Sequence, residues 1–298
     1  MNNKSSFVVV IGYSSVDYSM RVRDFRGIGN TTLVQRRLSA TWPEAGGVAR
    51  FFPGLVDGSK CAAISWVGSD KQSQEWTQEI ESIGVDTSGI SVLAGTAPTS
   101  YLFHDTLGST TCFFAPGILD SSHQIISESQ SQLLLNASHV IAAVGPEAAT
   151  RQMLEILKPS TVLIWTVKAD SESLPLDLRT RLFQRANIVI YSHQELPFLQ
   201  EISLIGDKDP LQANFAKKLI IRTSGKSQVE CTDDGVRASF EVDPIEGEIN
   251  ATGAGDYFAG QFIGSYIPTT KLSASVELAI SRTSIFLSNR TYEKVSTQ

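Results

Sequence analysis

Short runs of β-branched and other apolar residues alternate with segments of helical spacing along most of this chain. The clearest runs are Phe7 to Ile11, Val140 to Val144, Val162 to Thr166, Ile188 to Tyr191 and Leu219 to Arg222. Each is about as long as a β-strand, and its continuous apolar character is typical of strands buried on both faces. The alternation predicts repeated βαβ units, and therefore a mostly parallel sheet covered by helices.

The intervening segments carry apolar residues at the spacing of amphipathic helices. They are Gln74 to Ile83, Glu147 to Leu157, Leu178 to Arg185 and Leu211 to Lys218. The chain has 298 residues, and no internal repeat, long linker or low-complexity segment divides it. We therefore predict one α/β domain over residues 1–298, with helices on both faces of its sheet.

Two segments break this rhythm and have the pattern of β-hairpins. They are residues 13–40, rich in Val, Arg and Thr, and residues 98–115, where Leu107-Gly108 separates two alternating runs. Hairpins inserted between βαβ units tend to form a separate small sheet, so we predict a lid that can cover a ligand. A third hairpin is predicted at Val229 to Val242, because Asp234-Gly235 is a tight-turn signal.

Charge and hydropathy exclude several kinds of partner. The chain has 25 Lys+Arg against 31 Asp+Glu, a net charge of −6, and a sequence pI near 5.3. Because no general positive field exists to attract phosphates, we expect no nucleic acid and no membrane as partner, and a small-molecule substrate instead. No apolar stretch approaches the roughly 18 residues of a membrane span, and Met1 to Ser6 lack the apolar region of a signal peptide. We therefore expect a cytoplasmic protein.

The three cysteines give no sign of a disulfide framework or a metal site. Cys61, Cys112 and Cys231 are odd in number, far apart and without a C-x-x-C spacing. Such residues are usually small buried groups in a reducing compartment.

The most informative stretch is residues 250–263, where small residues lead directly into an apolar helix. Gly253 and Gly255 allow backbone N–H groups to converge at the helix N-terminus, where unpaired donors and the helix dipole can hold a phosphate. Asp256, in the first turn, would lie beside that anion and could accept a proton from an attacking hydroxyl. A plainer interpretation, an acidic residue in an ordinary first turn behind a glycine turn, stays open on spacing alone.

This stretch resembles the C-terminal signature of the ribokinase-like (PfkB) carbohydrate kinases, which Thr252 through Asp256 match without a gap. Four weaker matches occur in the family's order: Gly12 with Asp17 after the first strand, Ala45 to Arg50 at the paired-glycine motif, Ser192 to Glu195 at the Asn-x-x-Glu motif, and Thr223 to Gly225 at the nucleotide loop. The resemblance covers nearly the whole chain. It implies a ribokinase-like α/β fold with a β lid, and ATP-dependent phosphorylation of a hydroxyl on a sugar or sugar-like small molecule.

The resemblance also implies roles for single residues. Asp256 would be the catalytic base, beside an anion hole formed by Gly253, Ala254 and Gly255. The substrate would be held by Asp17, Gly46 and Gly47, and the ATP site would be lined by Thr223, Gly225 and the last helix, Ser273 to Asn289. Glu195 would help to organise Mg²⁺ and phosphate, through water.

Several positions depart from the family's pattern. Asn250 replaces the first Asp of the signature, next to a region that borders a monovalent-cation site in some members, so K⁺ activation is left open. Ser192 replaces the Asn of Asn-x-x-Glu, and Phe51 replaces an Asn near the substrate. The segment Trp165 to Asp170 stands where the family often has an Asp-Pro-Asn-like sequence.

These departures leave two alternatives beside a sugar kinase. The first is a nucleoside kinase of the same fold, favoured if the aromatic Phe51 faces the ligand. The second is a sugar- or nucleoside-binding protein with little turnover, against which the intact segment Gly253 to Asp256 argues. Because lids of this family sometimes pair, a homodimer through the lid is a further expectation. Gly225-Lys226-Ser227 imitates the end of a P-loop, but Ile220 stands where that motif needs its first glycine.

Overall fold

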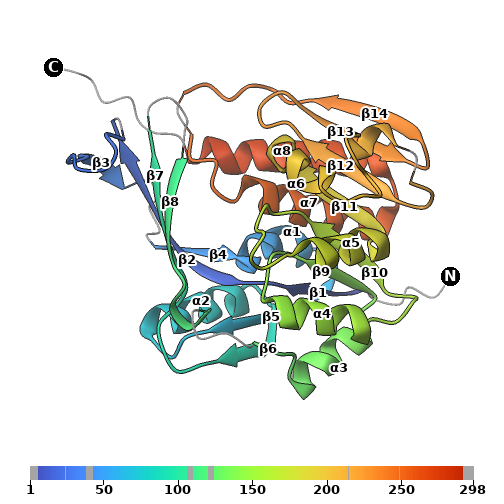
Figure 1. Ribbon diagram of the computed structural model, residues 1–298, viewed down its shortest axis with the longest axis horizontal. Helices are drawn as coiled ribbons and strands as arrows, with labels where there is room; N and C mark the ends of the chain where they lie inside the picture. Colours follow the sequence, from blue (N-terminus) through green and yellow to red (C-terminus); the bar gives the residue numbers. More distant parts are fainter. Residues whose placement is uncertain are drawn as a thin grey trace.

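The computed structural model describes residues 6–23, 25–37, 43–105, 110–119, 124–213, 215–247 and 249–290. Figure 1 shows a large sheet with helices packed around it and a smaller sheet standing at one edge. The predicted turn at Leu107-Gly108 lies outside the described residues, as do positions 24 and 38–40 of the first predicted hairpin.

The large sheet has nine strands, and the last seven in the spatial order given below run parallel to one another. The two pairs formed by the first three strands of that order are antiparallel. In spatial order the strands are β14 (Val236–Glu241), β13 (Gln228–Asp233), β12 (Leu219–Thr223), β11 (Ile188–Ser192), β10 (Val162–Thr166), β9 (His139–Ala142), β1 (Phe7–Ile11), β5 (Lys60–Val67) and β6 (Asp86–Val92). This confirms the predicted mostly parallel sheet.

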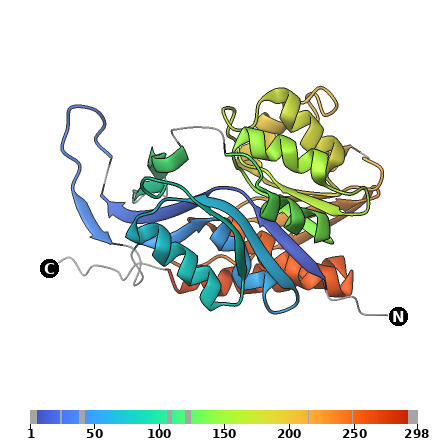
Figure 2. The same ribbon diagram turned by 90° about the horizontal axis from the view of Figure 1, so that it is seen from below.

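Helices cover both faces of this sheet, and Figure 2 shows the two layers from the side. One face packs against α3 (Glu128–Asn136), α4 (Glu147–Ile156), α5 (Leu176–Arg185) and α6 (Leu196–Gln200). The other packs against α1 (Phe52–Leu55), α2 (Lys71–Ser82), α7 (Ala254–Thr269) and α8 (Leu272–Ser288). Four short 3₁₀ turns complete the described elements: η1 (Val48–Phe51), η2 (Gly117–Leu119), η3 (His193–Glu195) and η4 (Pro210–Gln212).

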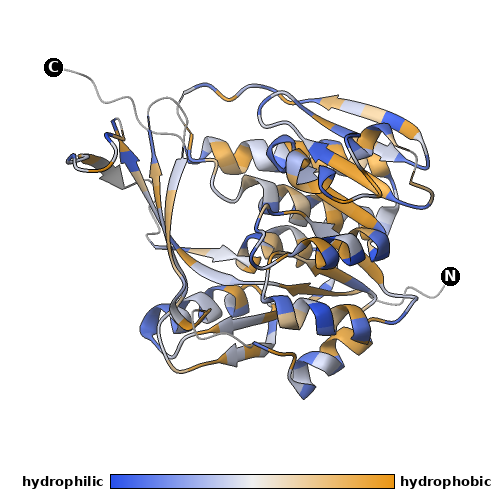
Figure 3. Ribbon diagram, in the orientation of Figure 1, coloured by the Kyte–Doolittle hydropathy of each residue, from blue (hydrophilic) through white to orange (hydrophobic). Residues whose placement is uncertain are grey.

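The strands are apolar on both sides because each side meets a layer of helices. Figure 3 shows these strands as largely hydrophobic ribbons in the interior. In β1, Val9 and Ile11 join the core beneath α3 to α6, whereas Val8 and Val10 join the core beneath α1, α2, α7 and α8. Successive side chains of a strand point to opposite faces, so a strand between two helical layers needs apolar residues at every position.

The smaller sheet is the predicted lid. It contains β2 (Ser14–Val22), β3 (Val34–Arg37), β4 (Glu44–Gly47), β7 (Thr99–His104) and β8 (Thr110–Ala115), in the order β3-β2-β7-β8 with β4 also paired to β2. The antiparallel pairs β2–β3 and β7–β8 confirm both predicted hairpins. The sequence did not predict β4, which adds the paired glycines to the lid.

The third hairpin is also confirmed, since β13 and β14 turn at Asp234 and Gly235. The predicted helix over Leu211 to Lys218 is wrong, because the described part of this segment forms only the 3₁₀ turn η4. Asp209 caps that turn by accepting the Leu211 N–H at 3.0 Å. Lys217 then adopts a left-handed φ of 63°, which ends any helical path and directs the chain into β12.

The order of strands places a topological switch point between β1 and β9. From β1 the sheet grows through β5 and β6 in one direction and through β9 to β12 in the other. Ligands of open α/β sheets bind at such a switch point, beyond the carboxyl ends of the strands. There Gly12 lies so close to the Val144 carbonyl that a Cβ would meet it at 2.7 Å, and the chain passes on from Tyr13 into the lid.

Among the helices that the structure describes, none is long and apolar enough to cross a membrane.

Candidate active site

The glycine loop before α7 is fixed by close packing of that helix against α1. A Cβ on Gly260 would lie 2.1 Å from the Phe51 carbonyl oxygen, and one on Gly264 would lie 2.0 Å from that of Gly54. Only glycine allows two backbones to approach this closely. The contact positions the N-terminus of α7, where Gly253 adopts a left-handed φ of 74° and the helix begins at Ala254.

This N-terminus leaves backbone donors open to a ligand. The Ala254 N–H donates to the Ala251 carbonyl at 3.1 Å. In the described part of the chain no acceptor is found for the N–H groups of Gly255 and Asp256, as expected in a first helical turn. A Cβ on Gly255 would have no neighbour within 4 Å, so space for an anion lies in front of these donors.

Asn250 stabilises the glycine loop through its side chain. Its side chain is fully buried, and its Oδ1 accepts the Thr252 N–H at 3.0 Å. The departure from Asp at this position therefore keeps an acceptor for the turn and removes a negative charge.

Asp256 lies among charged groups at the start of α7. The side chain keeps partial access to solvent but sits deep among protein atoms, and this burial raises the pKa of its carboxyl to about 6. Lys168 and Arg50 act against the rise in pKa, while Glu195 and Asp17 add to it. The structure thus brings together three of the predicted residues, Asp17, Glu195 and Asp256, which lie far apart in the sequence.

Asp17 enters the site from lid strand β2. Its Oδ1 accepts the Ser15 hydroxyl at 2.8 Å, and its Oδ2 accepts from Nη2 of Arg50 at 3.1 Å. A Cβ on Gly46 would lie 2.3 Å from Oδ2, so glycine is needed there for the carboxylate to take this position. Gly47 has a φ of 60° and packs on the Tyr13 carbonyl, where a Cβ would be only 2.1 Å away.

The sequence analysis assigned no role to three charged residues of the site, Arg50, Glu44 and Arg290. Nη2 of Arg50 donates to Glu44 at 2.8 Å as well as to Asp17. Arg290 donates to the same Glu44 oxygen at 2.5 Å and to the Thr252 carbonyl at 2.8 Å. A signal existed for Arg50, which is a single charge inside the otherwise apolar segment that follows the paired glycines.

Lys168 was noted only as part of an unusual segment. It follows β10 at the carboxyl edge of the sheet, is exposed, and lowers the pKa of Asp256. Its ammonium group therefore faces the region in front of the glycine loop.

The lid touches the glycine loop directly. Nε2 of His104, on β7, lies 3.3 Å from the Thr252 hydroxyl, and its Nδ1 lies 2.9 Å from Thr110 on β8. Burial and the nearby Arg290 lower the pKa of His104 to about 4, so the imidazole is neutral at pH 7. This contact joins the lid to the glycine loop, the two parts that lie on either side of the proposed ligand space.

The remaining predicted residues lie at the carboxyl edge of the same sheet or beside it. Thr223 ends β12 next to Ser192 of β11, and Gly225 follows in a turn with a φ of 59°. Glu195 accepts the Ser192 N–H at 2.6 Å, which fixes one carboxylate oxygen. Asn289 is exposed at the end of α8, directly before Arg290.

The expectation that Phe51 could face a ligand is wrong. Its side chain is 1% exposed and belongs to the core beneath α7. The backbone turns through η1 so that Arg50, not Phe51, is directed at Asp17. Phe114 is an aromatic residue on the face of the lid that carries Asp17, because the register aligns it with Ser100 and Ser100 with Asp17.

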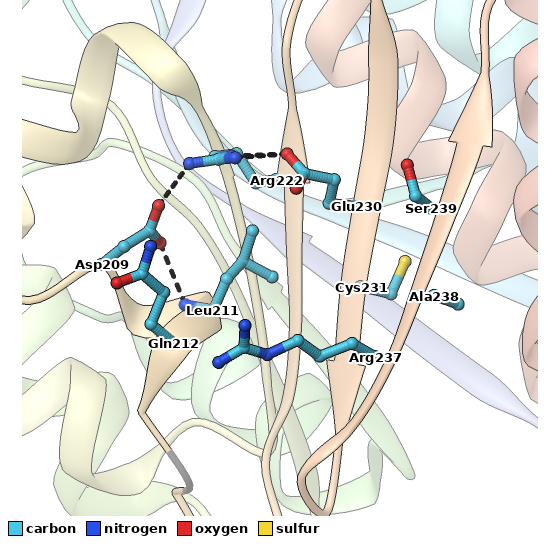
Figure 4. A pocket seen from close by; sticks show the side chains of 9 residues that line it. All are labelled: Asp209, Leu211, Gln212, Arg222, Glu230, Cys231, Arg237, Ala238 and Ser239. Atoms are coloured by element: carbon cyan, nitrogen blue, oxygen red, sulfur yellow. Dashed lines mark hydrogen bonds and ion pairs between the residues drawn. The ribbon is translucent and has the colours of Figure 1, made fainter.

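A separate cavity of about 260 Å³ lies between η4 and strands β12 to β14 (Figure 4). Within it Arg222 pairs with Asp209 and Glu230. None of the residues that line it belongs to the glycine loop or to the lid.

Comparison with solved structures places this fold in one class. A ribokinase from Cryptococcus neoformans in complex with ADP superposes with a TM-score of 0.80, 18% identity and coverage of 96% of this chain and 95% of that one. A nucleoside kinase from Burkholderia thailandensis in complex with inosine gives a TM-score of 0.73, 15% identity and coverage of 95% and 92%. The nine-stranded sheet, its lid and these neighbours define a ribokinase-like α/β protein.

The family follows from the sequence. The model of the pfkB family carbohydrate kinases matches residues 5–289, and the chain belongs to that family. Among curated proteins, a cytidine kinase from Thermococcus kodakarensis is 26% identical over 283 residues, covering 92% of this chain and 94% of the relative. A nucleoside kinase from Methanothermobacter thermautotrophicus is 21% identical, covering 87% and 82%. The chain is therefore a phosphotransferase with an alcohol group as acceptor, of a family that uses ATP.

Proposed function

We propose that this protein transfers the terminal phosphoryl group of ATP to a hydroxyl of a sugar or sugar-like molecule, with Asp256 as the general base. The observation that carries the proposal is the position of Asp256 beside the open donors of Gly255, with Asp17 of the lid close enough to influence its pKa. A base, an anion pocket and a group for binding hydroxyls are the three parts that such a transfer needs.

The pKa of Asp256 suits a base at neutral pH. At about 6 it leaves the carboxylate mostly ionised at pH 7, yet more basic than an exposed Asp. Asp256 would take the proton of the attacking hydroxyl, while the open N–H groups of Gly255 and of Asp256 itself, in the loop formed by Gly253 and Ala254, would stabilise the charge on the transferred group. The closed lid would exclude water that could otherwise hydrolyse ATP.

The substrate would lie between the lid and the glycine loop. Asp17 would accept hydrogen bonds from the hydroxyls of the substrate. Because Gly46 and Gly47 carry no side chain, β4 can lie close to Asp17 and still leave room for the substrate. The Asp17 carboxylate is already oriented by Ser15 and Arg50, which reduces the entropy lost on binding.

The residues present fit ATP and Mg²⁺. Thr223, Gly225 and Asn289 would line the nucleotide site, and the open space at Gly255 is a cradle for phosphate. No cluster of three or more acidic, His or Cys residues that could hold a metal alone exists in the described chain. Glu195, one oxygen of which is engaged by Ser192, would hold Mg²⁺ through water, as is usual when phosphates supply the other ligands. Mg²⁺ would supply charge neutralisation at the phosphates.

A nucleoside is the second candidate substrate. Phe114 is half exposed on the lid face that carries Asp17, where its ring could stack on a base. Relatives described as cytidine kinase and nucleoside kinase support this candidate.

The test is ADP release from ATP and Mg²⁺ against D-ribose, D-fructose, a sugar acid, cytidine, adenosine and inosine. We expect turnover with one class of acceptor, and loss of about 10²-fold or more in kcat for Asp256→Asn, because general-base catalysis contributes that much. Equal rates for Asp256→Asn and wild type would remove Asp256 as the base. Acceptors that raise the Tm without any turnover would instead indicate a binding protein.

The proposed homodimer rests on the outer face of the lid. Phe25, Tyr101 and Phe113 are exposed there, and Phe113 packs against Phe25 at 6.3 Å between ring centroids. Exposed apolar patches often mark interfaces. Light scattering should give twice the 32.4 kDa of one chain, and Phe113→Ser should return the mass to one chain. A wild-type mass of one chain would exclude a stable dimer.

A further inference from the structure

Resting on the kinase proposed above, we propose that Arg50, Glu44 and Arg290 are positioning residues that couple the substrate-binding Asp17 of the lid to the glycine loop. Together with Asp17 they form one buried ion-pair network, which begins at β2, passes through η1 and β4, and ends at Arg290, two residues after α8. Through it, the position of Asp17 depends on the position of Thr252, although Asp17 lies in the lid sheet and Thr252 in the loop before α7.

Arg50 is the link on the substrate side. It is 9% exposed, and its Nη2 bridges Asp17 and Glu44. The stem of the same side chain packs on the glycine loop, since a Cβ on Gly253 would lie 2.9 Å from both Cδ and Nε. Its buried Nε has no partner among the described residues. Arg50 therefore contacts both the lid carboxylate and the loop that precedes α7.

Arg290 is the link on the phosphate side. Its Nη1 donates to the Thr252 carbonyl at 2.8 Å, and its backbone carbonyl accepts the Asn250 N–H at 3.1 Å. Both bonds act on the loop that precedes α7. Its Nη2 donates to the same Glu44 oxygen that Arg50 uses. Glu44 therefore receives both arginines on one oxygen, and a shift of either moves the other.

The charges of the network indicate that it fixes the positions of its side chains and adds little to the stability of the fold. Two arginines and two carboxylates balance, and all four side chains are at most 10% exposed. Such groups must give up hydration, so a buried network of this kind often stabilises a fold no more than apolar residues of the same volume would. What it supplies is a fixed geometry that each bond imposes on the next.

The first test measures the coupling without any substrate. Hydrogen–deuterium exchange is compared for wild type, Arg290→Met, Glu44→Gln and the control Arg179→Met. Arg179 is equally buried and bonded to Phe198 and Glu201, but it lies on α5 on the opposite face of the sheet. We expect Arg290→Met and Glu44→Gln to speed exchange at least about threefold in peptides covering 14–19 as well as 250–256, and Arg179→Met to change neither. Faster exchange confined to 250–256 in Arg290→Met would overturn the proposal.

The second test separates the two ends kinetically, with the best acceptor from the panel above. Arg50→Met should raise the acceptor KM about tenfold, and Arg290→Met should mainly lower kcat. In the double variant, kcat/KM should be at least about threefold higher than the product of the two single effects predicts, because either change already breaks the network. Independent, multiplying effects would contradict the coupling.

The pH profile of Arg50→Met gives a readout that simple loss of folded protein would not move. Asp256 is faced by Lys168 and Arg50, which lower its pKa, and by Glu195 and Asp17, which raise it. Removing Arg50 should therefore shift the acid limb of kcat to higher pH, whereas Arg179→Met should leave it in place. If the wild type turns over no acceptor, the kinase proposal fails, and the exchange experiment still decides on the network.

Discussion

The glycine loop of α7 and lid strand β2 each bring one carboxylate to the candidate site, but they are positioned by different means. Backbone packing of α7 on α1, through Gly260 and Gly264, places Asp256. Asp17 is instead held by a hydroxyl and an arginine, in a sheet that meets the glycine loop through His104. The first arrangement is rigid because backbones cannot interpenetrate, whereas the second depends on hydrogen bonds that can be broken and remade.

This difference matches what each half would do in a kinase. Stabilising a developing charge demands donors that do not move during the reaction. A substrate, in contrast, must enter and leave, so the group that binds it belongs on an element that can open. The site thus combines a fixed half with one that we expect to be movable, and the ion-pair network lies between them.

Two glycine variants of α7 should break the fixed half in opposite ways, and we expect these effects to be the largest. Gly260→Ala places a methyl group 2.1 Å from the Phe51 carbonyl. Overpacking of this kind costs about 3 kcal/mol, and the better helix propensity of Ala returns about 1. We expect a net loss of about 2 kcal/mol in the free energy of unfolding, measured by urea denaturation.

Gly255→Ala is the matched change in the same helix. Its methyl group meets nothing within 4 Å, so stability should stay the same or rise slightly. The methyl group would fill the space in front of the open donors, and we expect kcat to fall about tenfold or more. Full activity in Gly255→Ala would show that no phosphate lies there.

Gly46→Ala tests the movable half. Its Cβ would meet the Asp17 carboxylate at 2.3 Å, and a side chain can turn away from such a contact where a backbone cannot. We therefore expect a small change in stability, a rise in the acceptor KM of about tenfold, and little change in the KM for ATP. An equal rise in both KM values would mean that β4 shapes the whole site instead of the substrate end.

The sequence predicted the fixed half well because its determinants are local. The run from Thr252 to Asp256 and the small residues of α7 are contiguous, and each strand of the large sheet has its own apolar pattern. The movable half depends on residues that meet only in three dimensions. Nothing near Arg290 in the sequence indicates that it reaches Glu44. The side of η1 on which Phe51 lies depends on the backbone of that turn, where a shift by one residue exchanges Phe51 with Arg50. Spacing alone could not tell which of Arg50 and Phe51 would face the ligand.

Ionised Asp256 should destabilise the folded state at neutral pH, because the raised pKa that suits a base also disfavours its charged form. Its folded pKa of about 6 exceeds the ordinary 3.8, so the folded state binds the proton more tightly than the unfolded state does. Stability from this group is therefore present below about pH 3.8 and is lost as the pH rises through 6. Asp256→Asn should raise the Tm at pH 7 and have little effect near pH 4. The wild-type kcat should fall as the pH drops below about 6, because the base becomes protonated.

The smallest expected effect concerns the contact between the two halves. His104 has the opposite shift, with a folded pKa of about 4 against an ordinary 6.5. The unfolded state binds the proton more tightly, so the stability due to neutral His104 is present above 6.5 and is lost as the pH falls toward 4. His104→Gln keeps a polar group next to Thr252 but cannot titrate. We expect its Tm to match that of wild type at pH 7 and to fall less between pH 6.5 and 4.5. Parallel Tm curves for the two proteins would mean that the lid contact does not hold the imidazole in its neutral form.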